Sequence, residues 1–148
     1  MVCKDCGFVY YINASAAVAA FIVNDKDELL VCTRAKEPAK GKFDLPGGFV
    51  DGDETADEAV RREILEELNV QVTESKLLFS LPNDYLYSGL TVPTLDLFFV
   101  CKIDNYENIQ AADDVESIQF IALDQLNIED FGLNSIKKGI SIFCLKTF

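Results

Sequence analysis

The sequence has no histidine, so a histidine general base is excluded and no histidine can serve as a metal ligand. Basic residues are also few, because 13 Lys and Arg stand against 25 Asp and Glu and the formal net charge is -12. Binding to nucleic acid irrespective of its sequence requires clustered Lys and Arg that displace phosphate counterions. We therefore expect no nucleic-acid partner.

Long apolar runs are missing as well. The longest near the start, AAVAAFIV at 16–23, has eight residues, which are too few to span a bilayer, and its flanks are unlike those of a secretion signal. No internal repeat, low-complexity tract or linker rich in Pro, Gly or Ser divides the chain. Because the 148 residues are 49% hydrophobic and 26% charged, we expect one compact cytoplasmic domain with no membrane partner.

A disulfide framework is not indicated either, because the five cysteines are odd in number and have no framework-like spacing. Cys32 and Cys101 lie inside apolar, strand-like runs. We predict that both are buried thiols, which stay reduced in the cytoplasm.

Five apolar, alternating or β-branched runs predict strands. They are AAVAAFIV at 16–23, ELLVCTR at 28–34, KLLFSL at 76–81, TLDLFFVCKI at 94–103 and VESIQFIAL at 115–123, with NDKD at 24–27 as a hairpin turn between the first two. A C-terminal helix is predicted because Leu133, Ile136, Ile140 and Phe143 recur at steps of three or four residues. This mixed order predicts an α/β sandwich.

Another helix is predicted to begin at about residue 56, because Thr55 and Glu58 have the spacing of a capping box. Asn69 suits a left-handed C-cap, so Glu66 and Glu67 fall in the last turn, where the helix dipole disfavours negative charge. At helical spacing Val60, Ile64 and Leu68 form an apolar stripe, and Glu63, Glu66 and Glu67 lie on an adjacent face. Local helix energetics therefore oppose this cluster of glutamates.

Two interpretations of the glutamates are open. A charge run on a helix is commonly a solvated face. Here, however, the helix follows Pro46-Gly47-Gly48, a turn that lets the backbone approach a ligand closely. Convergent oxygen ligands are what Mg²⁺ or Mn²⁺ prefers, and such ions are often shared with substrate phosphates.

The segment 48–70 resembles the Nudix box, whose pattern is GX5EX7REUXEEXGU. Six of the seven fixed letters match, in Gly48, Glu54, Arg62-Glu63 and Glu66-Glu67, and the U positions hold Ile64 and Val70. Asn69 stands where the pattern has glycine, and the turn is expected to survive because Asn tolerates left-handed geometry. The resemblance implies a Nudix-type α/β/α sandwich with a mixed β-sheet over 14–148.

The same resemblance implies a hydrolase of nucleoside diphosphates linked to another moiety, with Mg²⁺ or Mn²⁺ as cofactor. It implies that the Gly48 carbonyl and the carboxylates of Glu63, Glu66 and Glu67 bind the metal. It further implies that Arg62 orients the glutamates and that Glu54 braces the loop against the helix.

A carboxylate must act as general base, and Glu63 and Glu116 are the candidates. Glu116 opens the segment VESIQF, where the family often supplies a further acid, although it is equally well a solvated edge residue. Arg34 and Lys42 flank the expected cleft and are candidates for holding phosphate, against the alternative that they are ordinary exposed bases.

Residues 1–13 are expected to form an extension outside the domain. Cys3-Lys-Asp-Cys6-Gly followed by Tyr10-Tyr11-Ile12-Asn13 resembles the second knuckle of the zinc ribbon that precedes some Nudix domains. Four-coordinate structural zinc usually needs two such pairs, and only one is present, so we interpret the segment as a vestigial half-ribbon. One chain is therefore expected to hold well under one tightly bound zinc, and zinc is not expected as a cofactor.

Substrate identity is not fixed by these motifs. SLPNDYLYSG at 80–89 shares little with the array typical of NADH pyrophosphatases, which disfavours NADH. Tyr85 and Tyr87 are candidates for stacking on a base, although such tyrosines more often serve packing. A hydrolase that sanitises damaged nucleoside triphosphates, a nucleotide-binding regulatory domain without catalysis, and an acidic module that docks a basic partner are the alternatives. The resemblance also favours a homodimer.

Overall fold

The structure is a computed structural model that describes residues 1–146, so the last two residues of the expected domain 14–148 lie outside the described part. The strands are β1 (Ser15–Phe21), β2 (Glu28–Arg34), β3 (Phe43–Asp44), β4 (Gly47–Phe49), β5 (Val72–Tyr87), β6 (Leu90–Ile103) and β7 (Val115–Ala122). The α-helices are α1 (Ala56–Leu68) and α2 (Asn134–Leu145), and two short 3-10 helices cover Leu123–Gln125 and Ile128–Asp130.

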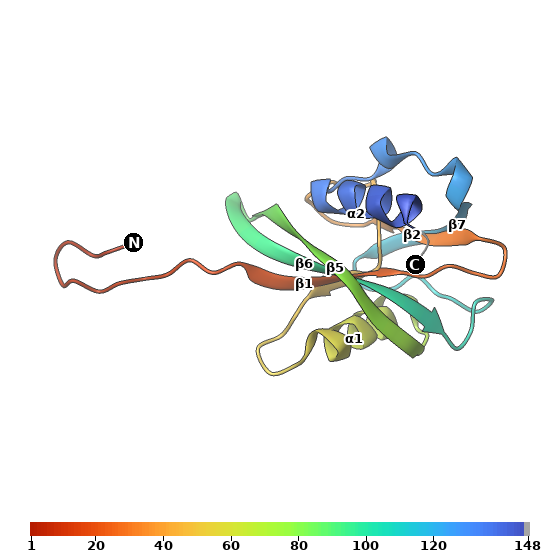
Figure 1. Cartoon of the computed structure of the whole chain (residues 1–148), viewed down its shortest axis with the longest axis horizontal. Coiled ribbons are helices and arrows are strands. Elements are labelled where there is room, and N and C mark those ends of the chain that lie inside the picture. The colour runs from red at the N-terminus through yellow and green to blue at the C-terminus, as the bar shows by residue number, and fades with distance from the viewer. Residues whose placement is uncertain (147–148) are drawn as a thin grey trace.

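The strands form two sheets between the two helices (Figure 1). One sheet has the order β4-β1-β6-β5, in which β1 is parallel to β6 and the other pairs are antiparallel. The second sheet has the order β3-β2-β7 and is antiparallel. With α1 on one side and α2 on the other, this arrangement confirms the predicted α/β/α sandwich with mixed pairing.

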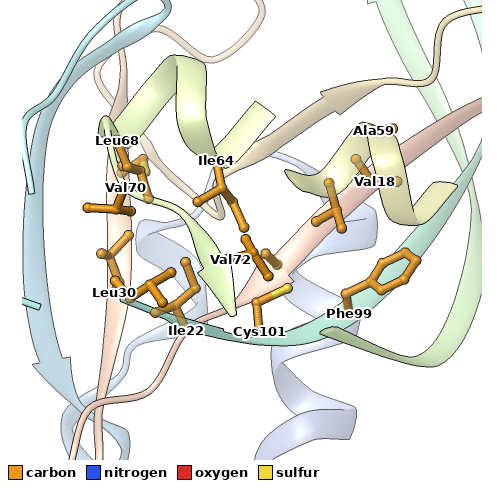
Figure 2. Close-up of a cluster of buried hydrophobic side chains, with 14 of the residues drawn as sticks. Val18, Ile22, Leu30, Ala59, Ile64, Leu68, Val70, Val72, Phe99 and Cys101 are labelled. Carbon is orange, nitrogen blue, oxygen red and sulfur yellow. The ribbon is translucent and has the colours of Figure 1, made fainter. Parts of the chain in front are cut away.

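Strand β1 reads as a continuous apolar run because both of its faces are buried. Val18 and Ala20 belong to the core cluster that includes Ile64 of α1, as Figure 2 shows in part. Ala19 and Phe21 belong to the second cluster, which includes Ile140 of α2. Successive residues of a strand point to opposite faces, so one strand supplies both cores.

Helix α1 has the ends that its sequence predicts. The Thr55 side chain accepts a hydrogen bond from the backbone N–H of Glu58, and the Glu58 carboxylate accepts one from the backbone N–H of Thr55. At the other end Asn69 adopts a left-handed conformation with φ 55°. Ile64 and Leu68 are completely buried, so the face of α1 that carries them packs on the core. The opposite face of α1 is thereby directed toward the glycine turn.

The predicted strand 28–34 has the bounds of β2, and the remaining predicted strands fall within or at the edges of observed ones. β5 and β6 extend well beyond 76–81 and 94–103 as a long hairpin that turns at Ser88 and Gly89, both with positive φ. The prediction of buried, free thiols at Cys32 and Cys101 is confirmed. Within 1–146, no helix has the length and apolar character needed to cross a membrane.

We predict that Ile64→Ala lowers the free energy of unfolding by about 2–5 kcal/mol, because Ile64 is 0% exposed and its removal leaves a cavity. The adjacent Leu65 is 48% exposed, so Leu65→Ala is the matched control and should change stability by less than about 0.5 kcal/mol. Urea unfolding of the two variants measures both values. Equal losses would contradict the assignment of the buried face of α1.

Candidate active site

The site surrounds Gly47 and Gly48, which begin β4 where it pairs with β1. Gly47 has φ 148°, and a Cβ there would lie 2.0 Å from the carbonyl oxygen of Val18. A Cβ on Gly48 would lie 2.5 Å from a carboxylate oxygen of Glu63. Only glycine fits at position 47. At position 48 the lack of a side chain leaves room for the Glu63 carboxylate against the backbone.

The Glu67 carboxylate lies in this narrow space although it is charged in water. Glu67 is 7% exposed, and its Oε2 accepts a hydrogen bond of 2.9 Å from the backbone N–H of Gly47. The pKa of Glu67 is raised to about 8, chiefly by burial; the Gly47 N–H lowers it, and the charges of Glu63, Asp44 and Asp113 raise it. No cation of residues 1–146 forms an ion pair with Glu67.

Arg62 connects the other acidic side chains of the box. Its Nε and Nη2 donate to the two oxygens of Glu54 at 3.0 and 2.6 Å, a bidentate pair that lowers the pKa of Glu54. Its Nη1 donates to Glu63 at 2.9 Å and to Glu66 at 3.1 Å. Nη2 also donates to the carbonyl oxygen of Phe49 at 3.1 Å, so Arg62 ties α1 to the end of β4.

Glu63 is held between Arg62 and its acidic neighbours. Burial raises its pKa, the bond and charge of Arg62 lower it, and the charges of Glu66 and Asp113 raise it again, with an upward net shift. A buried carboxylate with a raised pKa gains from an added positive charge nearby. The donor chemistry of Glu63, Glu66, Glu67 and the Gly48 carbonyl, all oxygen atoms, thus fits a hard divalent cation.

The positions of these carboxylates limit how they can bind such a cation. Within residues 1–146, no group of three or more Cys, Asp or Glu side chains is gathered closely enough to hold a metal ion. Glu63 and Glu66 point to Arg62, and Glu67 points to Gly47. The three carboxylates therefore need side-chain rotation to converge on one ion.

A cavity of about 320 Å³ opens beside the glutamates. Glu63, Glu66, Glu67, Arg62 and Gly48 all contribute to its wall. The wall also includes residues of the two sheets, namely Asp44, Asn83, Tyr85, Thr94 and Asp96. Asp96 accepts hydrogen bonds of 2.6 Å from Thr94 and 2.5 Å from Ser135, so a buried polar surface faces the cavity.

The remaining predicted residues have different positions. Arg34 lines the cavity, where it forms an ion pair with Asp44 and donates to the Tyr85 hydroxyl at 3.2 Å. Lys42 is exposed and is not part of the cavity wall, whereas Lys36 is. Glu116 is exposed on β7, also outside the wall. The roles predicted for Arg34, Lys42 and Glu116 remain predictions.

Asp113 was not singled out by the sequence, yet it lines the cavity and raises the pKa of both Glu63 and Glu67. Its loop is fixed to the end of α1, because the Ala112 N–H donates to the Glu67 carbonyl oxygen at 2.9 Å. In the sequence, Asp113 is marked only as one of two adjacent aspartates before the strand at 115–122. Acidic loops are common in a chain of net charge -12, so this pair did not indicate a site residue.

Comparison with known proteins identifies a family model and related sequences. A family model described as NUDIX domain matches residues 14–140. An ADP-ribose pyrophosphatase of Methanocaldococcus jannaschii is 33% identical over 118 residues, which cover 78% of this chain and 66% of that protein. The chain spans from 32% to 66% of the length of the four curated relatives compared first.

Solved structures give the same fold. A NUDIX hydrolase from Nitrosomonas europaea aligns with a TM-score of 0.73 at 20% identity, over 97% of this chain and 77% of that one. A bifunctional NMN adenylyltransferase/ADP ribose pyrophosphatase from Francisella tularensis, complexed with AMP and Mn ion, aligns with a TM-score of 0.67 at 26% identity. The alignment covers 90% of this chain and 42% of that protein.

The raised pKa of Glu67 generates a prediction for the metal-free protein. Between 4.5, the ordinary value, and about 8, the folded protein holds a proton that the unfolded chain has released. The free energy of unfolding therefore falls as pH rises through this window. We predict that Glu67→Gln removes a large part of this fall, which is on the order of 1 kcal/mol per pH unit.

Urea unfolding in EDTA at about pH 5.5 and about pH 7.5, both inside this window, measures the effect. Glu66→Gln is the control, because the Glu66 side chain is 47% exposed and also contacts Arg62. An identical pH dependence in wild type and Glu67→Gln would contradict the inferred state of this carboxyl group.

Proposed function

The chain belongs to the Nudix family, and on that premise we propose that it hydrolyses a phosphoric anhydride bond in a nucleoside diphosphate linked to another moiety, with Mg²⁺ or Mn²⁺. The observation that carries the proposal is the Arg62-linked glutamate set beside the Gly47-Gly48 turn, at the wall of a cavity of about 320 Å³. The similarity to an ADP-ribose pyrophosphatase supports the same class of reaction.

A divalent cation held by Glu63, Glu66, Glu67 and the Gly48 carbonyl would neutralise the diphosphate and lower the pKa of a water molecule. The protein's own part is to position these donors. Arg62 keeps Glu63 and Glu66 on one side of α1 while its bidentate pair with Glu54 fixes the guanidinium. The Gly47 N–H fixes the direction of Glu67 in the same way.

The general base is a carboxylate in this proposal, because the chain has no histidine. Glu63 is a candidate by its buried position at the cavity wall, and Asp113 is a further one. The loop of Asp113 is anchored to Glu67, which keeps its carboxylate close to the glutamates. Glu116 lies on β7 outside the cavity wall and is less well supported.

The charges of the cavity favour a diphosphate over a triphosphate. Within the described residues, the cations of the cavity wall are Arg34, Lys36 and Arg62, and each of them is paired with an acidic side chain. A third phosphate would face the carboxylates of Asp44 and Asp96. A moiety that carries hydroxyl or amino groups would instead donate hydrogen bonds to these acceptors.

We predict that the protein hydrolyses members of a panel of nucleoside diphosphate derivatives only with added Mg²⁺ or Mn²⁺, and that Glu67→Gln lowers kcat at least about 100-fold. The matched control is Glu74→Gln on β5, whose carboxylate is exposed and pairs with Lys102 away from the cavity. Equal turnover in excess EDTA would contradict metal dependence, and binding of nucleotide without turnover would favour a regulatory domain.

The identity of the base is tested separately. We predict that Asp113→Asn lowers kcat by about 100-fold or more while Glu116→Gln stays within about threefold of wild type, as expected for loss of general base catalysis. Both changes remove one negative charge and keep the shape of the side chain, but only Asp113 lines the cavity. The reverse order of the two losses would assign the role to Glu116.

A further inference from the structure

The first ten residues form a small hairpin outside the α/β/α sandwich, which we call the N-terminal hairpin (residues 1–10). Val2 and Val9 form an antiparallel bridge, and the Cys3 N–H donates to the Phe8 carbonyl oxygen at 2.8 Å. The Gly7 N–H donates to the Cys3 carbonyl oxygen at 3.0 Å, with Gly7 at φ 72°. The hairpin therefore has a defined turn, and Cys3 and Cys6 both lie at it.

The sulfur of Cys3 is surrounded by hydrogen-bond donors in this turn. The backbone N–H of Cys6, the backbone N–H of Asp5 and the Cys6 side chain each lower the pKa of the Cys3 thiol, in that order. Both cysteines are exposed to solvent. Backbone N–H groups that point at a thiolate stabilise it as a metal ligand, as second-sphere bonds do in zinc sites.

Two thiolates supply only half of a tetrahedral zinc site. The other cysteines cannot complete it within the same chain, because Cys32 and Cys101 are buried in the sandwich and Cys144 lies on α2. No cluster of three or more Cys, Asp or Glu side chains suited to a metal ion occurs in 1–146. Residues 1–146 thus supply two thiolates and no further ligands at this place, and a second copy of the hairpin would bring the two that are missing.

We propose that the N-terminal hairpins of two copies of this chain share one zinc ion through Cys3 and Cys6 of each copy. A twofold axis through the ion would make the two hairpins equivalent, which is the commonest symmetry of protein dimers. Binding exchanges four thiol protons for one zinc ion, so the site forms with release of protons. This inference is independent of the proposed hydrolysis. It gives half a zinc ion per chain, and so it departs from the expectation, drawn from the sequence, that zinc is not a cofactor.

The apolar surface of the extension supports a second copy as the occupant. Residues 1–15 are all exposed, and Figure 1 shows the segment projecting away from the sandwich. Large apolar side chains are exposed throughout it, namely Met1, Val2, Phe8, Val9, Tyr10, Tyr11 and Ile12. Side chains of this kind gain by mutual burial once the metal holds two hairpins together. Two chains of charge -12 repel each other, so a metal tie is needed to hold them.

The test uses the full chain, reduced with a phosphine, stripped of metal and then titrated with zinc in excess Mg²⁺. We expect binding to saturate at one zinc for every two chains, with a twofold rise in mass by light scattering relative to the stripped protein. A chelator should restore the original mass. Co²⁺ in place of zinc should give the visible absorption of a tetrahedral thiolate site, which carboxylate ligands do not produce.

Matched variants separate this site from other metal ligands. The double variant Cys3→Ser/Cys6→Ser should lose both the zinc and the twofold mass change, whereas Cys144→Ser should keep both. Glu67→Gln should also keep the zinc and the mass change, because Glu67 lies on α1 and not in the N-terminal hairpin. One zinc per chain without a change in mass would overturn the proposal, as would a zinc content below about a tenth per chain at saturating zinc.

Discussion

A carboxyl group buried, among the described residues, without a cationic partner is the constraint on which the site depends. Glu67 is almost completely buried, and Glu63 lies beside it with Arg62 as its partner. Arg62 divides its donors among Glu54, Glu63 and Glu66, so a single positive charge serves three carboxylates. Because desolvation of a carboxylate is costly, such an arrangement is expected to persist only where an added cation repays it.

The sandwich provides the rigidity that this crowding requires. Complete burial of Ile64 and Leu68 fixes the rotation of α1, and the pairing of β4 with β1 fixes the glycine turn opposite it. The turn and the helix then approach so closely that a Cβ at Gly48 would meet the Glu63 carboxylate. Packing on one face of α1 thus sets the electrostatics on the other, and small rotations of the glutamates remain the adjustable part.

Local signals made α1, its caps and the glutamate set predictable from the sequence, because capping boxes, left-handed Asn and helical spacing involve neighbouring residues only. β3 and β4 were not predicted, since two or three residues carry no periodicity. Asp113 and Asp96 reach the cavity through the fold, from a loop after β6 and from the centre of a strand. Their proximity to the glutamates depends on tertiary packing, which no local pattern records.

The central claim is that the glutamates of α1 form a cation site that stays protonated in part until the ion binds. Calorimetric titration of the stripped Cys3→Ser/Cys6→Ser variant with Mn²⁺, in buffers of different ionisation enthalpy, measures affinity and proton release together. With the pKa of Glu67 near 8, binding at about pH 7 should release close to one proton, and Glu67→Gln should weaken binding and abolish the release. Mn²⁺ binding of unchanged affinity in Glu67→Gln, or no binding to the parent variant, would contradict the claim.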